Sequence, residues 1–207
     1  MKKEITIFIA GANKFSKWPK LSQKICTLLS KPLKLDKTDT EYTKFWKKDI
    51  RFKKKSNIWM KWSRKTDIFS KSIAVYKLKK LLKKNQNINV NLVGISLGGG
   101  IILKTIQKKK YSNIKKIILI ASINENKEIK NNKIPIYNIY SEKDNFAKFA
   151  IKLYSFNRGA LKLNGESITN IPLPGMQHHE LCENVTIKKG KYLGKRVTEL
   201  VFDILNK

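Results

Sequence analysis

A serine flanked by glycines stands where an apolar strand candidate meets a glycine-rich helix start. The segment reads Gly94-Ile95-Ser96-Leu97-Gly98, a G-x-S-x-G pattern. At such a junction a sharp turn can raise the serine hydroxyl above a sheet, while the glycines leave room for neighbouring backbone. Ser96 is therefore a candidate nucleophile. The alternative is a glycine-rich turn that binds a phosphate, although neither a P-loop lysine nor a G-x-G-x-x-G pattern accompanies it.

A serine hydroxyl needs an adjacent base before it can attack at neutral pH. The chain contains two histidines, and they are neighbours, His178 and His179, just beyond a weak strand candidate. A loop that follows a late strand can return an imidazole to the strand-to-helix turn. Both histidines are therefore candidates for the base.

The base in turn needs an acid that fixes its tautomer and stabilises the imidazolium. Asp144 is the one aspartate between Ser96 and the histidines, and it follows a strand candidate at 134–140. Its other possible role is to cap a helix that starts at Asn145. Nearby alternatives for the acid are Glu125, Glu128 and Glu142.

The elements that must position these residues follow from apolar periodicity. Strands are predicted at 4–10, 90–95, 114–121 and 134–140, with a weaker candidate at 168–171, and helices at 20–29, 70–84, 97–107 and 192–205. The 70–84 helix is expected to bury Ile73, Ala74, Tyr76, Leu78, Leu81 and Leu82. This alternation predicts an α/β fold with a mostly parallel central sheet and helices on both faces. No linker or repeat divides the 207 residues, so residues 1–207 are expected to form a single domain.

Three segments in this order resemble the α/β-hydrolase superfamily. Residues 93–99 look like its nucleophile elbow, 134–144 like its acid strand and loop, and 173–178 like the segment that supplies its base. The resemblance implies that Ser96 is the nucleophile, Asp144 the acid and His178 the base, since the family usually places the base three residues after such a glycine. His179 remains the alternative base.

The resemblance also implies an oxyanion hole made of backbone N–H groups. Leu97 would supply one donor, and Ala12 the other, with Asn13 next in line. The chain has Ala10-Gly11 where many members have His-Gly, which weakens the assignment of the second donor. Only a loop fits between Ala121 and Lys133, where the family commonly inserts a lid, so a reduced fold with no cap domain is expected.

The function implied is that of a small lidless serine hydrolase that cleaves a carboxylic ester or thioester through an acyl-serine intermediate. Its substrate would be a small-molecule or lipid-like acyl compound, with no cofactor and no metal. A catalytically inactive hydrolase fold that serves as a binding module is one alternative. The aromatic residues between 42 and 69 could form a wall facing the substrate, although core packing or stacking on single-stranded nucleic acid would also account for them.

The net charge of +30 raises a second alternative, a basic protein that binds nucleic acid or anionic membrane. Only four of the 45 basic residues are arginine, and the lysines are spread along the whole chain. Since arginine is the usual reader of phosphates, nucleic acid is not the expected partner. Clusters such as Lys53–Lys55 and Lys108–Lys110 could hold the protein weakly at an anionic membrane. Two unpaired cysteines and the absence of a bilayer-length apolar run predict a cytoplasmic protein.

Overall fold

Among the residues that the structure describes, six parallel strands form the central sheet. The computed structural model describes residues 3–11, 46, 49–52, 56–61, 68–107, 110–130, 132–155, 159–183 and 185–207. Within this part of the chain the strands lie in the order β2-β1-β3-β4-β5-β6, and each neighbouring pair is parallel. Their bounds are β1 Glu4–Ile9, β2 Asn57–Trp59, β3 Asn89–Ile95, β4 Ile114–Ile120, β5 Ile136–Tyr140 and β6 Ile168–Pro172. The α-helices of the described residues are α3 Ile68–Lys84, α4 Leu97–Ile106, α5 Asn145–Ser155, α6 His178–Cys182 and α7 Val197–Leu205.

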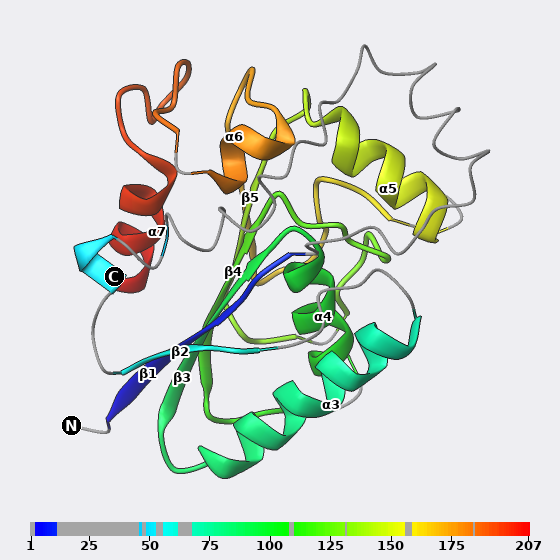
Figure 1. The fold of residues 1–207 in the computed structure, drawn as a ribbon, viewed down its shortest axis with the longest axis vertical. Coiled ribbons are helices and arrows are strands. Elements are labelled where there is room, and N and C mark those ends of the chain that lie inside the picture. Colours follow the sequence, from blue (N-terminus) through cyan, green and yellow to red (C-terminus); the bar gives the residue numbers. More distant parts are fainter. Residues whose placement is uncertain are drawn as a thin grey trace.

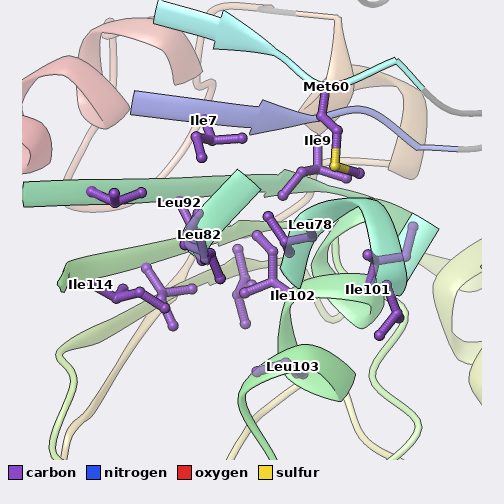
Figure 2. Close-up of a cluster of buried hydrophobic side chains, with 14 of the residues drawn as sticks. Ile7, Ile9, Met60, Leu78, Leu82, Leu92, Ile101, Ile102, Leu103 and Ile114 are labelled. Atoms are coloured by element: carbon purple, nitrogen blue, oxygen red, sulfur yellow. The ribbon is translucent and has the colours of Figure 1, made fainter. Parts of the chain in front are cut away.

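Helices cover both faces of this sheet, as predicted (Figure 1). On one face, α3 and α4 pack on side chains from β1, β3 and β4. Figure 2 shows this cluster, with Ile7 and Ile9 of β1 beside Leu78 of α3 and Ile102 of α4. All four side chains are nearly or fully buried. Burial of this size is the main favourable term in folding, at about 25 cal/mol per Å² of apolar area.

The opposite face of the sheet packs against α7. Phe8, which alternates with Ile7 and Ile9 along β1, contributes to this second cluster together with Val201 of α7. Trp46 and Phe52 are also buried here, and the Trp46 Nε1–H donates to the Cys182 carbonyl at 2.8 Å. These two aromatic residues of the 42–69 region are therefore core, and the interpretation of that region as a substrate-facing wall is wrong for them.

Several elements differ from the sequence predictions, and α5 is not among the predicted helices. The three-residue strand β2 was not predicted, because so short a segment shows no period of two. The last helix begins at Val197 rather than Tyr192, because the chain turns first through Gly190 and Gly194, whose φ values are +85° and +83°. The predicted helix at 20–29 lies outside the described residues.

The face that α3 presents to the sheet also differs from the prediction. Ala74, Leu78 and Leu82 are fully buried, as expected. Ile73 and Tyr76, which were expected on the buried side, are 55% and 66% exposed. The sequence was ambiguous because apolar residues occur all around the first half of this helix.

A cluster of charged groups joins the 3₁₀ turn η2 (Ile50–Phe52) to the start of α7. Arg51 donates to Asp49 through Nε at 2.9 Å and through Nη2 at 2.6 Å, and Nη2 also donates to Thr198 Oγ1 at 2.9 Å. The Arg51 hydrogen bonds hold the pKa of the Asp49 carboxyl below its usual value of 3.8, against the opposing effect of burial. A carboxylate with a lowered pKa stabilises the fold above its unfolded-state pKa, and this stabilisation is lost as the pH falls through the lowered value.

We expect Asp49→Asn to lower the free energy of unfolding by about 1–2 kcal/mol at neutral pH, because Arg51 loses its charged acceptor. Urea unfolding should show the difference from wild type shrinking as the pH falls below about 4, because Asp49 is protonated first in the unfolded chain and then, through its lowered pKa, in the folded protein. Asp203→Asn is the control, since Asp203 pairs with Lys195 in an exposed salt bridge and should matter much less. Equal losses of unfolding free energy in the two variants would contradict the stabilising role of the Asp49 carboxylate. So would a difference between Asp49→Asn and wild type that does not change with pH.

Candidate active site

Ser96 occupies a strained turn between β3 and α4. Its backbone has φ 52° and ψ −123°, a conformation that side-chain-bearing residues rarely adopt. The two glycines of the motif make this turn possible. A Cβ on Gly94 would lie 2.6 Å from Gly99 Cα, and a Cβ on Gly98 would overlap the carbonyl oxygen of Ile9. Helix α4 can therefore approach the sheet closely only with glycine at both positions.

Backbone hydrogen bonds hold the turn from the neighbouring strand β4. The Ser96 N–H donates to Ile120 O at 2.8 Å, and the Ser96 carbonyl accepts from Gly99 at 3.0 Å and from Ile123 at 3.4 Å. A second residue with positive φ, Ala121 at 47°, lies directly after β4. Two unusual backbone conformations thus lie side by side at the carboxyl edge of the sheet, where ligands bind in open α/β sheets.

The side chains of Ser96, His178 and Asp144 form one continuous chain of hydrogen bonds. His178 Nε2 lies 3.0 Å from Ser96 Oγ, and His178 Nδ1 lies 2.7 Å from Asp144 Oδ2. The Asp144 side chain is fully buried, and the His178 side chain is 15% exposed. Although Ser96 is the N-cap residue of α4, its hydroxyl is turned to His178 instead. The structure therefore brings together the three residues that sequence analysis proposed as nucleophile, base and acid.

Asp144 serves two elements at once. Its Oδ2 meets His178, while its Oδ1 accepts the backbone N–H of Ala147 at 2.7 Å and so caps the first turn of α5. From the sequence alone, the acid and the helix cap are alternative roles for Asp144. The geometry shows both contacts, one for each carboxylate oxygen.

His178 is the first residue of the short helix α6, whereas the sequence predicts a loop there. The Gln177 N–H donates to Glu180 Oε2 at 2.7 Å, and Lys188 Nζ donates to Glu180 Oε1 at 3.1 Å. Burial alone would raise the pKa of the Glu180 carboxyl, but these two donors outweigh it and hold that pKa below its usual value. The anionic carboxylate thus fixes the turn that carries His178. His179, the alternative base, is exposed.

Phe146 lies against the imidazole of His178. The two ring centroids are 4.6 Å apart, with the planes tilted by 49°. Phe146 also packs on a small apolar cluster formed by Ile123, Ala150 and Ile151. Phe146 is not among the site residues predicted from the sequence, and no motif marks it. Its position two residues after Asp144 is the one feature of the sequence that places it near the site.

Two backbone donors were predicted for an oxyanion hole. Leu97 is the first residue of α4, so the helix has no carbonyl one turn earlier that could accept its N–H. Ala12 and Asn13, the candidates for the second donor, lie outside the described residues. The preceding residue, Gly11, lies directly against the serine, since a Cβ there would be 2.8 Å from Ser96 Cβ and 3.3 Å from Ser96 Oγ.

The alternative acids have other surroundings. Glu125 Oε1 pairs with Lys71 Nζ at 3.1 Å, Glu128 Oε2 lies 3.4 Å from Lys130 Nζ, and Glu142 is exposed. Among the described residues, His, Cys, Asp and Glu side chains nowhere gather in a group of three or more that could hold a metal ion. In the same part of the chain, the helices are too short or too polar to cross a bilayer.

Comparisons with known proteins agree with this architecture. A structure described as a predicted CIB-like hydrolase from Thermoplasma acidophilum matches with a TM-score of 0.54 and 15% sequence identity, over 98% of this chain and 86% of that one. An esterase from Exiguobacterium antarcticum matches with a TM-score of 0.51 and 10% identity, over 100% of this chain and 92% of that one. No protein-family model and no curated protein sequence matches. At these identities the similarity concerns the fold, and the chain has the α/β-hydrolase fold.

Proposed function

We propose that this protein is a serine hydrolase that cleaves a carboxylic ester or thioester through an acyl-Ser96 intermediate. The observation that carries the proposal is the hydrogen-bond chain from Ser96 Oγ through both nitrogens of His178 to the buried Asp144. A base within reach of the nucleophile, itself oriented by a third group, is the arrangement that activates a serine. The strained backbone at Ser96 supports the same function, because such strain gathers at reacting groups.

In the proposed reaction, Ser96 Oγ attacks the substrate carbonyl carbon while His178 Nε2 accepts the hydroxyl proton. Asp144 stabilises the resulting imidazolium through Nδ1–H. The Leu97 N–H would stabilise the negative charge that develops on the carbonyl oxygen. As the tetrahedral intermediate collapses, Nε2–H protonates the departing alcohol or thiol. Water, deprotonated by His178, then hydrolyses the acyl-serine and restores the enzyme.

An acyl substrate that enters an open site fits this chain better than one whose binding depends on a lid. Between β4 and β5, helical structure is absent from residues 121–130 and 132–135, the described part of the segment where a cap would be inserted. We propose a small-molecule or lipid-like acyl group, with either an alcohol or a thiol as the leaving group.

We expect a fluorophosphonate probe to label the wild-type protein and to leave the Ser96→Ala variant unlabelled. In His178→Ala the labelling rate should fall by about 10²–10⁴-fold, because the serine loses its base. His179→Ala is the matched control, since its exposed side chain should leave labelling unchanged. Unlabelled wild-type protein that is folded by circular dichroism would refute the hydrolase proposal and favour an inactive binding module.

Two substitutions of Asp144 separate its two contacts. In Asp144→Asn, labelling should fall by up to about 10⁴-fold because an amide cannot stabilise the imidazolium as a carboxylate does. Its side-chain oxygen can still cap α5, so stability should change little. Asp144→Ala should lose labelling to the same degree and also lose about 0.5–2 kcal/mol of stability with the cap. Thermal melts and labelling rates measure the two effects, and full labelling of Asp144→Asn would remove Asp144 from the proposed mechanism.

Gly11→Ala should displace Ser96, because the new methyl group would lie 2.8 Å from Ser96 Cβ. We expect the labelling rate to fall by about 10²-fold, the usual cost of a displacement of about 1 Å in a reacting group. Gly194→Ala is the control. Gly194 has φ +83° and open space around it, so alanine strains the backbone in the turn before α7 without meeting Ser96. If both variants lose the same fraction of labelling, the loss reflects general instability and not contact with Ser96.

A further inference from the structure

One face of α3 exposes large apolar side chains to solvent. Phe69 is 83% exposed, Tyr76 66% and Ile73 55%. Their spacing of four and three residues places them on one side of the helix, and we call them the α3 stripe. The opposite side of α3 is occupied, because Leu78 and Leu82 point into the core cluster with Leu92 and Ile102 (Figure 2). The α3 stripe is therefore not the part of the helix that holds it to the sheet.

Lysines continue the same face toward the end of the helix. The 17 residues of α3 include no acidic residue. Lys80 and Lys83 follow Tyr76 by one and two turns and are exposed. Lys77 and Lys84 flank them and are exposed as well. The face thus begins with aromatic and aliphatic groups and ends with a cluster of ammonium groups.

The stripe begins at the edge of the sheet that holds the candidate site. Helix α3 starts after the carboxyl end of β2 and ends before the amino end of β3, so its first turn lies at the carboxyl edge. Lys71 in that turn pairs with Glu125 at 3.1 Å. Glu125 belongs to the loop after β4, and the Ile123 N–H of the same loop donates to the Ser96 carbonyl. Figure 1 shows α3 at the periphery of the molecule.

We propose that the α3 stripe and the lysines beyond it form a docking surface for an anionic lipid membrane. Phe, Ile and Tyr side chains enter the boundary between headgroups and acyl chains, while lysines contact the lipid phosphates. A second copy of this chain is a poor occupant, because a net charge of +30 on each copy opposes their association. The lysine-rich, arginine-poor surface matches a diffuse anionic plane better than a partner read by directed hydrogen bonds. The proposal is independent of the proposed function, since docking requires no turnover.

The test measures binding to lipid vesicles by flotation, with the full chain carrying Ser96→Ala so that catalysis plays no part. We expect binding to vesicles that contain phosphatidylglycerol with phosphatidylcholine, and none to pure phosphatidylcholine. The triple variant Phe69→Ser, Ile73→Ser, Tyr76→Ser should bind at least about tenfold more weakly. Leu193→Ser is its control, because Leu193 is also 66% exposed but lies in the turn before α7. Equal binding by the triple variant and the control would overturn the proposal.

A second pair of variants separates a local surface from total charge. Lys80→Glu with Lys83→Glu should weaken binding by about tenfold or more, because two attractive groups become repulsive. Lys189→Glu with Lys191→Glu makes the same change of charge at two exposed lysines elsewhere and should weaken binding much less. Equal losses would show that only net charge matters and would overturn the proposal. A stripe-dependent dimer in sedimentation velocity without lipid would assign the face to a second copy and overturn it too.

Discussion

The close approach of α4 to the sheet is the constraint on which the rest of this structure depends. Gly94 and Gly98 bring the helix so near to β1 and β3 that the residue at the turn between strand and helix takes a conformation with positive φ. That residue is Ser96, and its hydroxyl therefore points toward His178 and does not cap α4. The apolar packing of β3 and α4 in the core offsets the conformational free-energy cost of this strained turn. A reactive geometry is thus built from backbone contacts that involve no reactive group.

The other two members of the hydrogen-bond chain are positioned by helix starts. Asp144 is held by its bond to the first turn of α5, and His178 by the capping contacts around Glu180 at the start of α6. Both helices begin just beyond the carboxyl ends of β5 and β6, so parallel strands deliver the two side chains to the same edge as Ser96. Phe146 then restricts the imidazole from the side. The positions of these two side chains are therefore set at helix starts, where backbone N–H groups lack a partner until a side chain accepts a hydrogen bond from them.

The sequence predicts the buried strands β1, β3 and β4 and the helix α4 closely, because long apolar runs leave few alternatives. It also identifies Ser96, Asp144 and His178, which the structure joins by hydrogen bonds, although their catalytic roles stay predictions. It does not predict β2, which is too short for a period, or the exposure of Ile73 and Tyr76, since α3 is apolar on more than one side. Contacts such as that of Phe146 with His178 depend on tertiary placement, which no spacing along the chain encodes.

The double use of Asp144 has a consequence for the ensemble of native conformations. Helix ends fray far more often than whole domains unfold, and each opening of the first turn of α5 releases the carboxylate that holds His178. We therefore expect the population of molecules with an oriented imidazole to fall whenever the first turn of α5 opens. The apparent affinity for a ligand that requires this order is reduced by the same fraction. Local helix stability and readiness of the site are in this way coupled, and residues of α5 outside the site can adjust both.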